Sequence, residues 1–264
     1  MPGAPDTTSA DAASGRREPK HAADKVRIRF RKSGTLRLLS HHDLMRTFER
    51  LLRRSELPFH RSQGFHPKPR LIFALSLPLG VVGREEVVEL ELGQVLPLED
   101  IHARLARQAP PGLEILSVRR IHLKVNAQVR RLAYALPVPA ERLPDLRSRI
   151  AEVLAAQECW IDRHRPQSRQ AGRRLDVRPF LVELLIHPHD GSEKSVMLEM
   201  VLRLTSAGTA RPEEVLGLLR LEDLLDAGVV FERSRLELHD ELPALEASAG
   251  NELEKGSHEK RDAD

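Results

Sequence analysis

Hydrophobic and polar residues alternate along several stretches of the chain, and these stretches fall into two similar halves. In KVRIRFRK the apolar residues occupy every second position, which predicts a strand with one buried side. A helix is expected over 40–56, because Ser40 and Asp43 form an S-x-x-D start signal and Pro58 stops the helix. Strands at 71–78 and 85–92, a helix at 98–108 and a strand at 113–121 complete a βαββαβ order.

The second half repeats this order less clearly. Its hairpin is expected around His189-Asp190-Gly191. The other segments of this half are expected at 129–138, 142–156, 159–165, 211–219 and 229–238. Because both halves have the order of the split-βαβ unit, we predict an α+β protein of two tandem ferredoxin-like (βαββαβ) units. Each unit is expected to have an antiparallel sheet covered on one face by two helices.

Both ends of the chain lack this periodicity. They are rich in Ala, Ser, Gly, Pro and charged residues, so they bury too little apolar surface to offset the entropy of ordering. We therefore expect a disordered N-terminal tail at 1–24, ferredoxin-like units at 25–124 and 125–242, and a disordered acidic tail at 243–264.

Composition narrows the class of protein. Of the 264 residues, 41% are hydrophobic, which suffices for globular cores. No stretch approaches the roughly 20 apolar residues of a membrane span, and the N-terminus has no apolar signal-peptide core. The single cysteine, Cys159, cannot build a disulfide framework or a multi-cysteine metal site. We expect a cytoplasmic protein with no cofactor, no metal and no membrane contact.

The net charge of +3 hides a basic region and an acidic one. Residues 25–70 contain thirteen lysines and arginines against three acidic residues, whereas 241–264 contain seven acidic residues and three basic ones. This asymmetry predicts an anionic partner for the first region. A basic surface that serves solubility alone is the alternative.

Arginines gather on one side of the helix expected over 40–56. At 100° per residue the apolar residues of this helix fall in one sector. The opposite sector holds Arg46, Arg50, Arg53 and Arg54, which we call the arginine face. Guanidinium groups bind phosphate in a bidentate manner and stay charged, so this face predicts contact with a nucleic-acid backbone. A solvated helix surface is the structural alternative.

The basic residues of the first strand have a different expected role. In the predicted strand order this strand neighbours EEVVELEL. Arg27 and Arg29 are therefore expected to form ion pairs across the sheet with Glu89 and Glu91.

A polar segment, RSQGFHPKP, precedes the strand expected at 71–78. Gly64 permits a tight backbone there, and Pro67 and Pro69 stiffen the chain. Hydrogen-bonding or charged side chains in it are those of Arg61, Ser62, Gln63, His66 and Lys68. A polar loop of fixed shape is typical of a binding site, with Arg61 and Lys68 as further nucleic-acid contacts. Capping of helix ends is the structural alternative.

The remaining candidates carry weaker signals. The histidines show no metal-ligand spacing, although His41 or His66 could serve as a general acid or base. Asp176 and Arg178, in LDVRPF before a strand, either brace the protein or contact a ligand. No Gly-rich phosphate loop and no nucleophile motif is present.

These motifs resemble a known family. LSHHDLMRTFERLLRR, SQGFHPKP, DVRPF and RPEEVLGLL look like the radical-SAM-linked protein family, a bacterial domain family of unknown biochemical function, over residues 25–237. Two positions depart from the family pattern, which commonly has leucine where this chain has His42 and asparagine where it has His66. The motif residues carried over are Ser40, His41, Asp43, Arg46, Ser62, Gln63, Gly64, Phe65, Pro67, Pro69, Asp176, Arg178 and Pro179.

The resemblance implies an RNA or ribosome context, because members are often encoded near ribonuclease E/G and ribosomal-protein genes. This chain lacks the C-x-x-x-C-x-x-C ligands of a radical SAM domain and so corresponds to the stand-alone form. The leading hypothesis is an adaptor that binds or presents tRNA or rRNA alongside a radical SAM protein or ribonuclease E/G. The alternatives are an RNA-processing or RNA-modifying enzyme with histidine acid–base chemistry, and a protein–protein adaptor for a radical SAM subunit.

Overall fold

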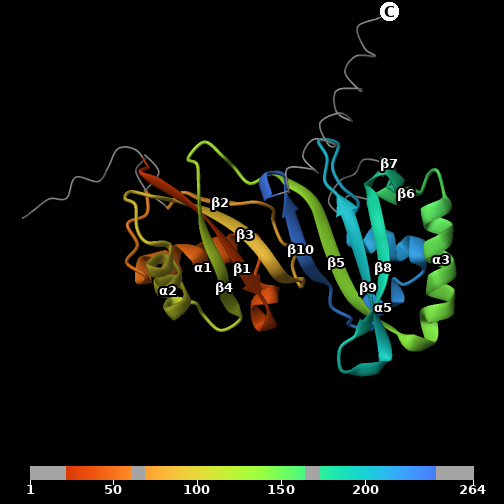
Figure 1. Ribbon diagram of the computed structural model, residues 1–264. Helices are drawn as coiled ribbons and strands as arrows, with labels where there is room; N and C mark the ends of the chain where they lie inside the picture. The colour runs from red at the N-terminus through yellow and green to blue at the C-terminus, as the bar shows by residue number, and fades with distance from the viewer. Residues whose placement is uncertain (1–21, 61–68, 164–172, 242–264) are drawn as a thin grey trace, which may run out of the picture.

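The computed structural model describes residues 22–60, 69–163 and 173–241, which form an α+β fold around one large sheet (Figure 1). The first half contains β1 (Asp24–Lys32), η1 (Gly34–Leu38), α1 (His41–Arg54), β2 (Leu71–Phe73), β3 (Val82–Leu92), α2 (Leu98–Gln108) and β4 (Leu113–Ile121). The second half contains β5 (Val129–Pro139), η2 (Ala140–Arg142), α3 (Leu143–Ala155), β6 (Trp160–Arg163), β7 (Arg173–Asp176), η3 (Arg178–Phe180), β8 (Leu181–His189), β9 (Ser192–Arg203), α4 (Pro212–Leu219), α5 (Asp223–Asp226), β10 (Glu232–Leu238) and η4 (His239–Glu241).

Both halves contribute to the same sheet. Its order is β4-β1-β3-β10-β5-β9-β8, with β2 paired to β3, and β6 and β7 form a separate pair. Strands within each half are antiparallel, while β10 pairs with β3 in parallel. The expectation of two separate antiparallel sheets is therefore corrected to one continuous sheet. The assignment of each half to the ferredoxin-like fold, and the expected domain boundaries, stay predictions.

The short strand β2 explains why the halves join. The strand expected at 71–78 ends at Phe73, because the chain then leaves the sheet and Leu77 packs into the core of the second half. β2 therefore pairs with β3 only from Val88 to Leu90. The start of β3, at Val82 and Gly83, remains free to pair with β10.

Two hydrophobic cores lie under the helices. The first contains the buried residues of α1 and α2 and the apolar side of β1, β3 and β4. The second contains those of α3 and α4 and the core side of β5, β8, β9 and β10. Figure 1 shows α1 and α2 beside the strands of the first half, and α3 at the opposite end of the molecule.

An ion pair is buried where the halves meet. Arg233 Nε donates to Glu86 Oε1 at 2.8 Å, and Arg233 Nη2 bonds the other carboxylate oxygen. The two side chains are 1% and 3% exposed. Gly83 gives Glu86 its space, since a Cβ at Gly83 would lie 2.5 Å from Glu86 Cγ. The pair therefore fixes the position of β10 against β3.

The last described residues bind the first-half sheet on the side opposite its helices. Arg27 is fully buried and donates to Glu89 at 2.8 Å, as the sequence predicts, and to Asp240 at 2.8 Å. The carboxylate of Glu241 accepts hydrogen bonds from the side chains of Arg27, Arg29 and Arg119. We call Asp240 and Glu241 the acidic clasp.

The predicted pairing of Arg29 with Glu91 is wrong. In the observed register Arg29 lies opposite Val87, and Glu91 lies opposite Lys25. Arg29 binds Glu241 instead, while the carboxylate of Glu91 is 3.3 Å from a guanidinium nitrogen of Arg70.

The acidic clasp makes stability depend on pH. Burial raises the pKa of the Asp240 carboxyl, but the hydrogen bond and charge of Arg27 outweigh it and hold the pKa below its usual value. Asp240→Asn is therefore expected to lower stability near neutral pH. This contribution is present above the unfolded-state pKa and is lost as the pH falls through the lower folded-state pKa.

Urea unfolding of the wild type and Asp240→Asn measures this contribution. The difference in unfolding free energy between them is expected to shrink below about pH 4. A difference that stayed constant down to about pH 2 would show that the charge of Asp240 does not stabilise the fold.

Candidate nucleic-acid interface

Helix α1 begins at the signal predicted from the sequence. Ser40 is its N-cap and accepts a hydrogen bond from the backbone N–H of Asp43, while Ser40 Oγ donates to Asp43 Oδ2 at 2.7 Å. The apolar side of α1 is buried through Leu44, Phe48, Leu51 and Leu52. The helix therefore turns its arginine face outward.

The arginine face is exposed and largely uncompensated. Arg46 is 74% exposed and lies 3.7 Å from Asp43, a distance at which an exposed ion pair contributes little. Arg50, Arg53 and Arg54 are also exposed, and within residues 22–60, 69–163 and 173–241 none of them has an ion-pair partner. The C-terminal dipole of α1 stabilises Arg53 and Arg54 in the last turn, which is a structural reason for their charge.

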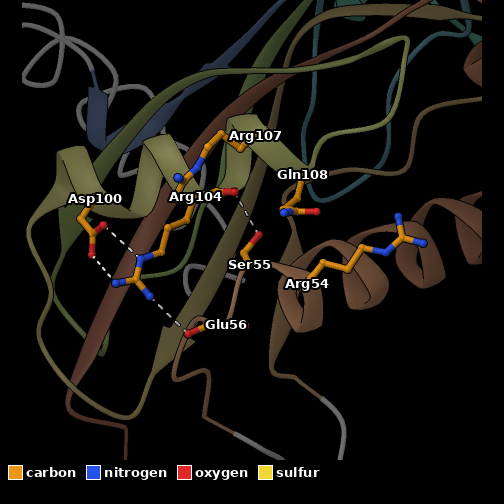
Figure 2. A pocket seen from close by; sticks show the side chains of 7 residues that line it. All are labelled: Arg54, Ser55, Glu56, Asp100, Arg104, Arg107 and Gln108. Atoms are coloured by element: carbon orange, nitrogen blue, oxygen red, sulfur yellow. Dashed lines mark hydrogen bonds and ion pairs between the residues drawn. The ribbon is translucent and has the colours of Figure 1, made fainter.

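Two adjoining pockets lie between α1 and α2, and we call them together the interhelical groove. The first has a volume of about 410 Å³ and is lined by Arg54, Ser55, Glu56, Asp100, Arg104, Arg107 and Gln108 (Figure 2). The second has a volume of about 320 Å³ and is lined by Leu36, Leu39, Thr47, Arg50, Leu51, Arg54, Gln108 and Pro110. Arg54 and Gln108 belong to both, so the two pockets adjoin at these side chains.

One arginine of the groove is held by its neighbours. Arg104 Nε donates to Asp100 Oδ1 at 3.0 Å, and Arg104 Nη2 is 2.9 Å from Asp100 Oδ2. The hydrogen bond from Arg104 to Asp100 and the charge of that carboxylate raise the pKa of the guanidinium. Arg107 is exposed and has no ion pair in the part of the chain that the structure describes. Arg107 is therefore available to a ligand, whereas the guanidinium of Arg104 is partly occupied by its ion pair with Asp100.

The residues of α2 are not among the nucleic-acid contacts that the sequence predicts. The sequence signal was present, because Arg104 and Arg107 are three residues apart on the polar side of an amphipathic helix. The packing of α2 against α1 cannot be read from this pattern. In the structure Ser55 Oγ, just after α1, donates to the backbone carbonyl of Arg104 in α2 at 3.3 Å.

The predicted polar loop lies outside the described residues. This applies to Arg61, Ser62, Gln63, Gly64, Phe65, His66, Pro67 and Lys68. Its flanks are described: the backbone N–H of His60 donates to the carbonyl of Glu91 at 2.8 Å, and Arg70 N donates to the carbonyl of His60 at 3.1 Å. These bonds hold His60 and Arg70 near the end of β3.

Ser40 and His41 lie at the start of α1. The adjacent carbonyl of Leu39 accepts a hydrogen bond from Lys32 Nζ at 2.9 Å, which places this helix end at the last residue of β1. Glu91, beside the loop flanks, is opposite Lys25 at the start of β1. His60 and Arg70, which flank the loop, therefore lie near the start of β1, whereas the residue before Ser40 contacts the last residue of β1.

His41 occupies a partly buried position at the start of α1. Its ring packs against Phe73 with centroids 5.3 Å apart, and its buried Nδ1 has no hydrogen-bond partner within the described ranges. Burial, and then the charges of His42 and Lys32, lower the pKa of the His41 imidazole. The ring is therefore neutral near pH 7 and able to accept a proton.

Asp176 and Arg178 make structural contacts. Asp176 Oδ1 accepts hydrogen bonds from the backbone N–H groups of Cys159 at 2.7 Å and Arg178 at 3.0 Å. The guanidinium of Arg178 donates to the carbonyls of Leu154 and Ala156, which end α3, and to that of Leu181. Together they anchor the β6–β7 pair and the start of β8 to α3 within the second half.

Other kinds of site receive no support from the described residues. In those ranges no cluster of three or more His, Cys, Asp or Glu side chains is arranged to hold a metal ion. None of the helices in the same ranges has the length and apolar character needed to cross a membrane.

The fold and the site thus define an α+β protein with a basic groove beside α1 and α2. Residues 25–212 match the family described as "Uncharacterized protein conserved in bacteria (DUF2344)", so the chain belongs to this bacterial family. No curated protein matches the chain.

Solved structures with some likeness to the chain are distant. One is a chain of a Cbf5-Nop10-Gar1 complex, with 11% identity and a TM-score of 0.41 over 80% of this chain. This likeness spans 48% of that longer chain. Another is an unknown protein from Galdieria sulphuraria, with 15% identity and a TM-score of 0.24, over 81% of this chain and 98% of that one.

Proposed function

We propose that this protein is an RNA-binding adaptor that holds RNA phosphates on the arginine face of α1. The observation that carries the proposal is the exposure of Arg50, Arg53 and Arg54 without an acidic partner in the described residues. A single exposed arginine is unremarkable, but three within about one and a half helical turns create a local positive potential. RNA offers the matching ligand, because its phosphates are closely spaced and accept bidentate guanidinium bonds.

The wider context supports the same proposal. The antiparallel orders β4-β1-β3-β2 and β10-β5-β9-β8 support our assignment of each half to the ferredoxin-like fold. The resemblance to the radical-SAM-linked family supports a cytoplasmic role in tRNA or rRNA metabolism, with a separate radical SAM protein or ribonuclease E/G as partner. The adaptor would then present RNA to that partner.

The proposal is tested by the salt dependence of binding. Fluorescence anisotropy with labelled tRNA is expected to give a plot of log affinity against log salt concentration with a slope of about −3, close to the value for four phosphate contacts. A neutral-backbone nucleic acid of the same sequence is the control and is expected not to bind. Affinity that did not change with salt would contradict the proposal.

Two further observations would separate the alternatives. Defined RNA fragments in the binding reaction, absent with His41→Ala, would support acid–base RNA cleavage through this residue. Co-purification of a radical SAM protein that survives nuclease treatment, without RNA binding, would support a protein–protein adaptor.

A further inference from the structure

The two pockets of the interhelical groove differ in chemistry. The pocket around Arg104 and Arg107 is lined by charged and polar side chains. The neighbouring pocket has apolar walls from η1, α1 and the chain after α2, with arginines at its edge. These walls are Leu36, Leu39, Leu51 and Pro110. The interhelical groove therefore consists of a cationic hollow and an apolar one that adjoin at Arg54 and Gln108.

Arginines border both parts of this groove. In Figure 2 the guanidinium groups of Arg54 and Arg107 lie on opposite sides of Gln108. Arg50 and Arg54 line the apolar pocket, and Arg107 lines the polar one. The apolar pocket therefore has Arg50 and Arg54 at its edge, and the polar pocket that adjoins it at Arg54 and Gln108 adds Arg107.

The lining retains positive charge after its own acids are counted. Four arginines face two carboxylates, those of Glu56 and Asp100. Asp100 is occupied by Arg104, and Glu56 lines only the polar pocket. The apolar pocket has no acidic residue among its lining, which suits a ligand with an apolar part between anionic groups.

We propose that the interhelical groove binds a single RNA strand, with one unpaired base in the apolar pocket and its flanking phosphates on Arg50, Arg54 and Arg107. A duplex presents phosphates and 2′-hydroxyls but keeps its bases stacked, so it cannot fill the hollow. A single strand offers a flat heterocycle with a phosphate on either side. The Gln108 amide, which both donates and accepts hydrogen bonds, meets the edge of that base.

This inference rests on the proposed RNA-binding function and adds the kind of RNA. Anisotropy with the full-length protein compares one labelled single strand with its own duplex at fixed salt. The single strand is expected to bind about tenfold more tightly. An abasic nucleotide within the strand is expected to remove most of this preference.

Thr47→Met tests the pocket itself. Thr47 lines only the apolar pocket, and methionine would fill this space without changing the charge. The affinity for the single strand is expected to fall about tenfold, with little change for the duplex. Gln108→Ala, at an exposed position, is also expected to lower the affinity for the single strand. It replaces Thr47→Met as the test if that variant folds poorly.

Each other outcome has a definite meaning. No binding of any RNA would overturn the proposed function and this inference together. Salt-dependent binding without preference for the single strand, or unaffected by Thr47→Met and Gln108→Ala, would overturn the inference alone. A nucleoside monophosphate that binds as tightly as the strand would assign the pocket to a free nucleotide. A polyaspartate peptide that binds as tightly would assign the pocket to an acidic protein. Either result would overturn the inference.

Discussion

Replacing Glu86 with glutamine is expected to lower the free energy of unfolding by about 3–5 kcal/mol, the usual cost of removing one partner of a buried ion pair. Arg233 is 1% exposed and would lose its counter-charge while remaining buried. Lys32 is buried nearby, and the charge of Glu86 partly offsets the lowering of its pKa by burial. Without Glu86, two buried cations would face each other across the junction of the halves. Urea unfolding followed by circular dichroism measures the effect.

A paired substitution provides the control. Glu86→Leu combined with Arg233→Met removes both charges and keeps apolar volume, so it is expected to recover most of the stability lost in Glu86→Gln. If the double variant were as unstable as Glu86→Gln, shape rather than charge would explain the effect. If Glu86→Gln unfolded like the wild type, the junction would not depend on this pair.

The second large effect concerns RNA affinity. Changing Arg50, Arg53 and Arg54 to glutamine is expected to make the log–log salt slope less steep by about two to three units, since each lost phosphate contact reduces it by about one. At about 0.1 M salt this corresponds to a loss of affinity on the order of 100-fold. Binding of labelled tRNA across a salt series measures both quantities.

A matched variant in the second half controls for net charge. Glutamine at Arg147, Lys194 and Arg203, all exposed, removes the same number of positive charges at a distance from α1. This variant is expected to keep nearly the wild-type slope. Equal losses in both triple variants would show that RNA senses the overall charge and not the arginine face.

The local pattern of apolar and polar residues was sufficient to predict many helices and strands of the fold. The bounds of α2 and β4 agree with their hydrophobic periodicity, and the Ser40–Asp43 signal marked the start of α1. The length of β2 was overestimated, because Leu77 continues the apolar alternation but packs into the core of the other half. Alternation of apolar and polar residues predicts that a side chain is buried. It does not predict which of the two hydrophobic cores that side chain packs against.

Contacts between residues far apart in the sequence limited how much of the candidate site could be predicted. The arginine face of α1 follows from helical periodicity, and its exposure agrees with that expectation. Arg29 is expected to pair with the acidic residues of the neighbouring strand but binds Glu241, 212 residues away. The groove was not foreseen, because no pattern within α2 places Arg107 beside Arg54. The predicted polar loop lies outside the described residues.

The acidic clasp also bears on how the chain folds as it is synthesised. Arg27 and Asp240 are 213 residues apart, so β1 leaves the ribosome long before the acidic clasp exists. β10, which pairs with the start of β3, is likewise made after the whole first half. Until then the nascent first half has an unpaired strand edge and a guanidinium cluster short of counter-charge. β10, the last described strand to be translated, therefore joins the sheet that β1 begins.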